Sequence, residues 1–75
     1  MRLSELTATQ KGIILKYPED TRITRRLIEM GVIPGIEFEY IRASIFGDPI
    51  EIKINDSFLV LRKKEAYLVA VRLIK

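Results

Sequence analysis

Short segments in which apolar residues alternate with other residues occupy much of this chain, and they constrain its fold most strongly. In 50–54, isoleucines at every second position are separated by Glu51 and Lys53, and 36–40 and 67–73 show the same period of two. Successive side chains of a β-strand point to opposite faces, so this period predicts strands with one buried face. Two further apolar runs, 13–17 and 58–61, are predicted as strands because β-branched and aromatic residues favour them.

Residues with turn chemistry separate these predicted strands. Pro18 closes the first one. Pro34-Gly35 suits the centre of a type II turn, because proline has a fixed negative φ and glycine tolerates a positive one. Gly47-Asp48-Pro49 and Asn55-Asp56 mark two later turns, and Lys63-Lys64-Glu65 interrupts the pattern briefly before the last strand. The sequence therefore predicts five short strands.

One segment between the first two strands has a helical period instead. Its apolar stripe consists of Ile23, Leu27 and Met30, widened by Ile28. Asp20 or Thr21 can cap the start of this helix through a side-chain oxygen. Gly31 follows the last apolar residue, where a left-handed C-terminal cap favours glycine. This is the only helix that the pattern predicts, apart from a short helical turn or irregular anchor at 3–6.

The length of the chain limits the fold further. Its 75 residues fit one domain, 1–75, in which roughly 60% of the surface of the unfolded chain becomes buried. A sheet of five short strands has unpaired edges, and curling into a small barrel limits them. We therefore expect a mostly β fold: a small SH3-like barrel of about five strands with one α-helix inserted between the first and second strands.

Two side chains that many enzymes and metal sites use are absent from the sequence. There is no histidine and no cysteine, so the chain has no imidazole for acid–base chemistry near neutral pH and neither of the ligands that zinc prefers. We interpret the acidic pairs Glu37/Glu39 and Glu19/Asp20 as a solvent-facing strand surface and the start of a helix. We expect no catalytic residue, no cofactor and no metal site within one chain, and therefore a protein that acts by binding.

Composition also bears on where the protein works. No run approaches the about twenty apolar residues that a membrane helix needs, and the first residues do not resemble a signal peptide. The lack of cysteine favours a reducing interior. We expect a cytoplasmic protein without membrane insertion. The net charge of +3 is modest and decides nothing by itself.

Two ordered blocks of the sequence resemble the signature of one family. The segment from Arg26 to Gly35 (RLIEMGVIPG) resembles the pattern R-L-x-E-L-G-hydrophobic-x-P-G of the FeoA family, small accessory proteins of bacterial ferrous iron transport. Gly47-Asp48-Pro49, the segment 59–62 and Glu65-Ala66 resemble that family's G-D-P…L-x-L-R-x-x-E-A stretch. The matching residues that we expect to determine the fold are Leu27, Gly31, Pro34, Gly35, Gly47 and Pro49.

The resemblance has small departures and clear implications. Met30 stands where the family has leucine, and Asn55-Asp56 stands where it commonly has a glycine. The resemblance implies an SH3-like domain that supports or regulates the GTP-dependent ferrous iron permease FeoB by binding its cytoplasmic region. A related domain ends some iron-dependent repressors as an interaction module, but this chain carries no helix-turn-helix.

Two surfaces are candidates for partner binding. Ile45 and Phe46 lie beside a predicted turn and would form a small apolar docking site if exposed, although we expect them to fold back onto the barrel. Arg22, Arg25 and Arg26 make one side of the helix basic and could meet an acidic partner. The alternative is a solvated helix face on which Arg25 pairs with Glu29. Residues 62–64 offer a weaker basic candidate.

Two other functions remain as hypotheses. Small basic barrels can bind nucleic acid, but this needs aromatic residues for base stacking, and we assign Phe38, Tyr40 and Tyr67 to the core. Nucleic acid is therefore an unlikely partner. The other hypothesis is a homo-oligomer, because the edge strands of a short barrel can pair across subunits.

Overall fold

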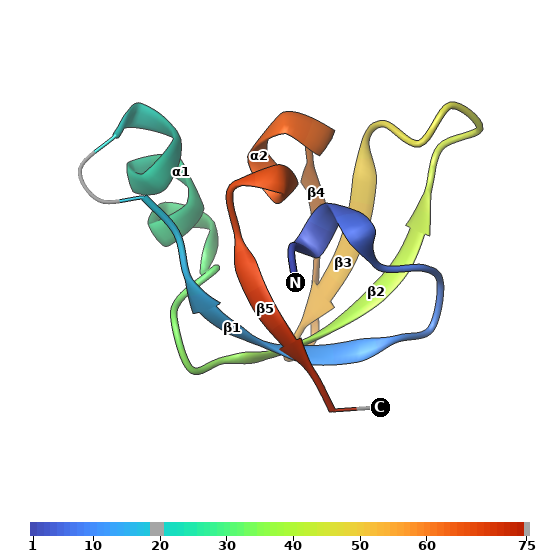
Figure 1. Cartoon of the computed structure of the whole chain (residues 1–75), viewed down its shortest axis with the longest axis horizontal. Coiled ribbons are helices and arrows are strands. Elements are labelled where there is room, and N and C mark those ends of the chain that lie inside the picture. Colours follow the sequence, from blue (N-terminus) through green and yellow to red (C-terminus); the bar gives the residue numbers. More distant parts are fainter. Residues whose placement is uncertain (19–20, 75) are drawn as a thin grey trace.

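The computed structural model describes residues 1–18 and 21–74 (Figure 1). Its elements, in chain order, are η1 (Leu3–Glu5, a 3-10 turn), β1 (Lys11–Lys16), α1 (Arg22–Met30), β2 (Glu37–Ala43), β3 (Ile50–Ile54), β4 (Ser57–Leu61), α2 (Lys63–Tyr67) and β5 (Ala70–Leu73). Within those residues, neither helix has the length and apolar character needed to cross a lipid bilayer. The predicted cap Asp20 and the acidic pair Glu19/Asp20 lie outside the described residues.

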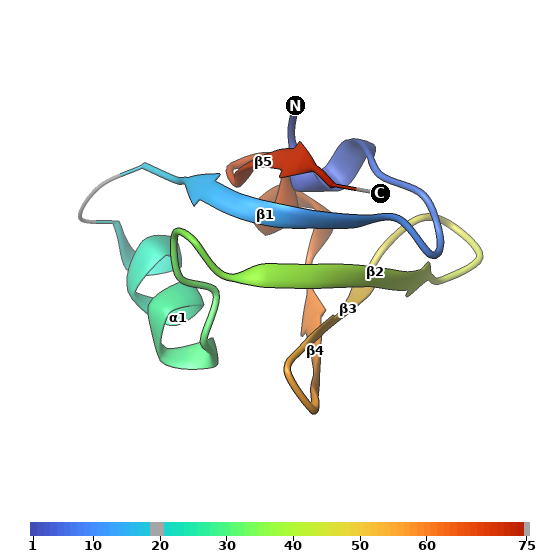
Figure 2. The same cartoon turned by 90° about the horizontal axis from the view of Figure 1, so that it is seen from below.

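The five strands form one antiparallel sheet in the order β4-β3-β2-β1-β5. Figures 1 and 2 show the sheet strongly bent, so that β4 and β5 come to lie on different sides of the interior. The register shifts between Tyr40 and Arg42 in β2 and between Ile14 and Lys16 in β1. Bulges of this kind increase local bending, which lets short strands wrap around a small core. The predicted five strands with a helix between the first two are confirmed.

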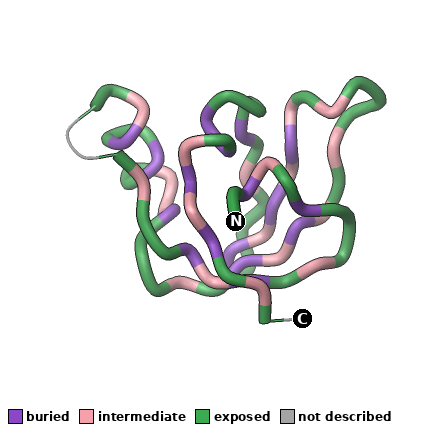
Figure 3. Tube along the Cα trace, in the orientation of Figure 1, coloured by how far each residue is buried: buried purple, intermediate pink, exposed green. Residues whose placement is uncertain are grey.

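The core lies on the concave side of the bent sheet, where buried segments from every strand converge (Figure 3). The alternation of side chains along β3 shows how the core forms. Its three isoleucines (Ile50, Ile52 and Ile54) are at most 5% exposed, while Glu51 and Lys53 face outward. Phe38 and Tyr40 are buried in the same way on β2, as predicted, and burial raises the pKa of the Tyr40 hydroxyl. Strand alternation in the sequence therefore becomes a single apolar interior.

Helix α1 is held by the caps that its sequence predicts. The Thr21 side chain accepts a hydrogen bond from Thr24 N at 3.0 Å, and Gly31 ends the helix with φ +95°. The amide of Val32 then returns to Leu27 O at 2.9 Å, a bond typical of a glycine-terminated helix. Leu27 is fully buried, whereas Ile28, at the margin of the apolar stripe, is 49% exposed.

The chain then reverses into β2 through the predicted turn at Pro34-Gly35. Gly35 has φ +92°, and Ile36 N donates to Ile33 O at 3.1 Å, which are the features of a type II turn. Gly35 N also donates to Ile14 O at 2.7 Å. The turn is therefore anchored to β1 as well as closed on itself.

Residues 63–67 form helix α2 instead of a brief interruption followed by a strand. The amide of Lys63 donates to Asp48 Oδ1 at 2.9 Å, and the amide of Arg62 donates to Glu65 Oε1 at 2.8 Å. Amides that a strand would have to pair elsewhere are thus satisfied locally, and this favours a helix turn. Tyr67 consequently lies at the end of α2 and is 53% exposed, so its assignment to a buried strand face is wrong.

Gly12 provides a test of how closely the strands pack. A Cβ added there would lie 2.7 Å from Arg72 O on β5 and 3.0 Å from the Phe38 ring on β2. We expect Gly12→Ala to lower the free energy of unfolding by about 1–3 kcal/mol, because a backbone oxygen cannot move aside cheaply. Urea denaturation measures this change.

Gly31→Asn provides a comparison in which backbone strain acts without a clash, since Gly31 has φ +95° and nothing lies within 4 Å of an added Cβ there. A Gly12→Ala protein as stable as the unmodified protein would contradict the close approach of β1, β2 and β5.

Candidate functional site

The loop 44–49 between β2 and β3 carries the most exposed large apolar side chains in the described part of the chain. Ile45 is 91% exposed and Phe46 is 89% exposed. The expectation that both fold back onto the barrel is therefore wrong. The hydrogen bond from Gly47 N to Ser44 O, 2.8 Å long, makes these two residues the centre of a four-residue turn. At these exposures neither side chain contributes to the core.

This hairpin tip is held in place by several hydrogen bonds. Ser44 N donates to Pro49 O at 3.0 Å, and the Ser44 hydroxyl donates to Asp48 O. Gly47 has φ +81°, and the peptide bond between Asp48 and Pro49 is cis. Because Asp48 also accepts from the first amide of α2, the tip is tied to a second element. A fixed apolar tip loses little conformational freedom on binding, which favours affinity.

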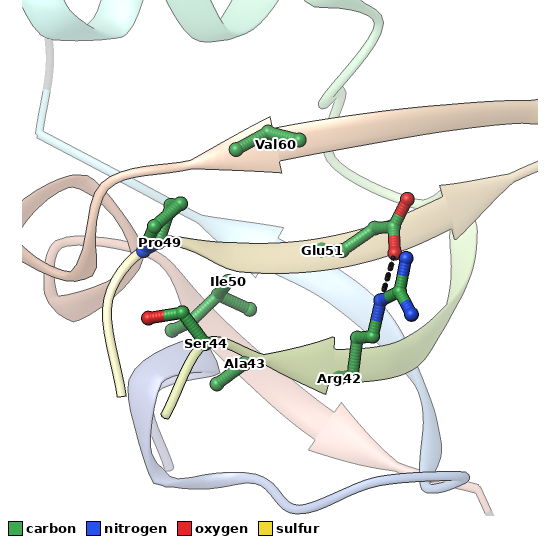
Figure 4. A pocket seen from close by; sticks show the side chains of 7 residues that line it. All are labelled: Arg42, Ala43, Ser44, Pro49, Ile50, Glu51 and Val60. Atoms are coloured by element: carbon green, nitrogen blue, oxygen red, sulfur yellow. Dashed lines mark hydrogen bonds and ion pairs between the residues drawn. The ribbon is translucent and has the colours of Figure 1, made fainter. Parts of the chain in front are cut away.

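An open groove of about 440 Å³ lies at the base of the tip (Figure 4). It is lined by Arg42, Ala43, Ser44, Pro49, Ile50, Glu51 and Val60. Arg42 Nε pairs with Glu51 Oε1 at 2.8 Å along one side, and Figure 4 shows Pro49 and Ser44 at the loop end of the same groove. The tip and groove together make a surface with an apolar centre and a charged margin, the usual composition of a protein-binding site.

The basic candidates lie elsewhere on the molecule. Arg22, Arg25 and Arg26 belong to α1, and Figures 1 and 2 both place α1 at the opposite side from the β2–β3 loop. The structure therefore does not bring the two predicted surfaces into one site. Arg26 has an internal role, because its Nη1 lies 3.0 Å from Glu65 Oε2.

Glu65 is a buried structural residue whose contacts sequence reasoning missed. Its side chain is 3% exposed, and its carboxylate accepts from the Arg62 amide and pairs with Arg26. A buried carboxylate is costly unless it is paired and hydrogen-bonded, so these contacts hold α1 against α2. The sequence offered one hint of this contact. Arg26 and Glu65 belong to the two blocks that resemble one family signature, and the structure brings these two blocks together.

A second open hollow, of about 620 Å³, lies between the N-terminal residues and α2. Arg2 lies 3.9 Å above the centre of the Tyr67 ring there, and its Nη1 donates to Tyr67 O at 3.1 Å. These polar and aromatic groups are already engaged with one another. No cluster of three or more potential metal ligands occurs among residues 1–18 and 21–74. The hairpin tip is thus the better candidate for a binding site.

Comparison with known proteins identifies the family. The FeoA domain matches residues 1–73. This chain belongs to the FeoA family. A Porphyromonas gingivalis protein, named Fe(2+) transport protein A/Fe(2+) transporter FeoB fusion protein, is 30% identical over 74 residues, which cover 99% of this chain and 9% of that protein. The FeoA family is accordingly associated with ferrous iron transport, and this chain corresponds to only a small part of the fusion protein.

Solved FeoA structures have the same fold. The FeoA protein of Chlorobium tepidum superposes with a TM-score of 0.90 at 31% identity, covering 100% of this chain and 71% of that one. Stenotrophomonas maltophilia FeoA complexed with zinc is described as a procaryotic SH3 domain protein, and it superposes with a TM-score of 0.82 at 28% identity, covering 96% and 89%. The predicted SH3-like fold of the FeoA family is therefore confirmed.

The Arg26–Glu65 pair can be tested by a double-mutant cycle. We expect Arg26→Ala to lower the free energy of unfolding by about 1–3 kcal/mol, because it leaves a buried carboxylate with only part of its hydrogen bonding. Glu65→Gln should cost less, since its amide oxygen can still accept from the Arg62 amide. Thermal or urea unfolding of both single variants and the double variant measures the coupling.

A coupling below about 0.5 kcal/mol, the range found for independent sites, would contradict a direct link between α1 and α2. Arg22→Ala serves as the control, because Arg22 lies on the same helix and takes part in no ion pair with another described residue.

Proposed function

We propose that this protein is a cytoplasmic accessory protein of ferrous iron uptake that binds the cytoplasmic region of the permease FeoB. We further propose that Ile45 and Phe46 make the central contact. The observation that carries the site is the exposure of 91% and 89% of these two side chains on a loop held by hydrogen bonds. Large apolar side chains in fixed positions contribute most of the binding energy in many interfaces.

The fusion relative supports the choice of partner. In Porphyromonas gingivalis, a segment similar to this chain and a FeoB transporter are named as parts of one protein. Joining two domains raises their effective concentration, so even a weak contact between them can form. The exposed tip and its groove offer a surface for such a contact.

The charge distribution supports a second contribution to binding. Arg22 and Arg25 lie on α1, away from the tip, and the chain carries a net charge of +3. Basic residues outside the central contact mainly raise the rate of encounter with an acidic partner and add little to the final affinity. We therefore assign the tip to affinity and the basic helix face to association rate.

Substitution at the tip tests the proposed site. We expect Phe46→Ser to weaken binding to the soluble cytoplasmic domain of FeoB at least about tenfold, since burying a phenylalanine contributes about 1.5–3 kcal/mol. Isothermal titration calorimetry, with and without guanine nucleotide, measures the affinity. The control is Phe58→Ser, which makes the same chemical change at a 58% exposed position on β4.

Two results would count against different parts of the proposal. Absence of binding by the unmodified protein at high micromolar concentration, in either nucleotide state, would contradict the partner. Full affinity in the Ile45→Ser/Phe46→Ser double variant would contradict the site while leaving the partner in place.

The role of the basic helix face has a kinetic test. We expect Arg22→Glu combined with Arg25→Glu to lower the association rate constant several-fold at low salt, with little change in dissociation. Stopped-flow or surface-binding kinetics at two salt concentrations measures both constants. Arg72→Glu, which reverses one charge on β5 and none on α1, is the control for charge reversal away from the helix face. A higher dissociation rate constant with an unchanged association rate constant would contradict this role and would place α1 in the central contact instead.

A further inference from the structure

The two edge strands of the sheet, β5 and β4, differ in whether another segment pairs with their outer side. The outer edge of β5 is covered by the start of the chain: Leu3 N donates to Val69 O at 2.9 Å, and Val71 N donates to Met1 O at 2.8 Å. Arg2 and Ala70 form an antiparallel bridge at the same place. β4, at the other edge, pairs with β3 alone among the described strands. Figure 2 shows β4 and its turn with β3 projecting from the body of the molecule.

The register of β3 and β4 determines which backbone groups of β4 face outward. The two-residue turn Asn55-Asp56 joins Ile54 to Ser57, and such a turn is closed by a hydrogen-bonded pair. Hydrogen-bonded and non-bonded pairs alternate along an antiparallel ladder, so Leu59 and Leu61 also bond to β3. The N–H and C=O groups of Phe58 and Val60 therefore point away from the sheet.

The side chains of these same residues are exposed as well. Phe58 is 58% exposed and Val60 is 51% exposed, and both stand on the outer face of the sheet. Lys53 Nζ lies 5.6 Å from the centre of the Phe58 ring, so the aromatic face is already covered in part by a cation. An edge strand with free backbone groups and apolar side chains is a template for pairing with another strand.

We propose that β4 pairs antiparallel with β4 of a second copy of this chain, with Leu59 of one copy opposite Leu59 of the other. In this register Phe58 lies opposite Val60 of the second copy, and their outward backbone groups exchange hydrogen bonds. Aromatic and β-branched side chains directly opposite each other stabilise such pairs. The two sheets become one continuous sheet across the subunits.

Charge complementarity favours this occupant and this register. At each end of the paired strands, Asp56 lies opposite Arg62 of the second copy. Both residues are exposed, and neither forms an ion pair with another residue of the described chain. A shift of two residues would put Phe58 opposite Arg62 or Val60 opposite Asp56, which sets apolar groups against charges. The segment 56–62 is thus complementary to itself in the antiparallel direction.

The size of the contact predicts its strength. β4 has five residues, so the pairing buries less area than a standard stable interface of about 1,600 Å². We expect a weak dimer, with a dissociation constant of about 0.1–1 mM, in fast exchange with the monomer. Sedimentation velocity and concentration-dependent amide chemical shifts in NMR spectra measure it, with the largest shifts expected at Phe58 and Val60.

A lysine at the edge is the first test of the surface. We expect Val60→Lys to weaken self-association at least about tenfold, because it puts like charges into the paired strands. Ile45→Lys is the matched control, since it makes the same kind of change at the hairpin tip, and it should leave self-association unchanged. A protein that stays monomeric up to about 1 mM, or a dimer lost in Ile45→Lys and kept in Val60→Lys, would overturn the proposal.

A charge exchange tests the register and the nature of the partner together. Asp56→Arg and Arg62→Asp should each weaken self-association at low salt, because each puts like charges opposite each other at both ends. An equal mixture of the two variants should recover association close to that of the unmodified protein. If the mixture associates no better than either variant alone, the pairing of two copies through β4 is overturned. An edge that pairs with a strand of a different protein would give this result.

Discussion

The arrangement of α1, α2 and the β2–β3 loop depends on the contacts of the Glu65 carboxylate. This carboxylate accepts from the Arg62 amide, which starts α2, and it pairs at 3.0 Å with Arg26 on α1. A neighbouring amide of α2 is satisfied by Asp48 of the β2–β3 loop. Two acidic side chains thus connect α1, α2 and the hairpin tip, because a short helix needs partners for its first amides and finds them in tertiary contacts.

This linkage has a consequence for binding. The tip that carries Ile45 and Phe46 is not a free loop, since the same aspartate that caps α2 also belongs to the tip. A surface held in its bound conformation loses less entropy on association than a mobile one. The residues of the FeoA signature are mostly structural, and in the proposed binding mode they contribute by holding an apolar surface in position.

The two proposed binding surfaces are separate on the molecule. The tip and its groove lie at the open end of the β2–β3 hairpin, whereas the β4 edge presents backbone groups as well as side chains. The first can bury apolar area and the second can extend a sheet, so they suit different partners and leave each other accessible except where Val60 borders both.

The sequence by itself determined the strands, helix α1 and the core, because alternation, helical spacing and capping residues act over a few neighbouring positions. It also identified Ile45 and Phe46 as unusual residues for a turn. Only the tertiary structure decided that they project, that 63–67 form a helix and leave Tyr67 exposed, and that Arg26 meets Glu65. These outcomes depend on hydrogen-bond partners from distant parts of the chain, which local periodicity does not encode.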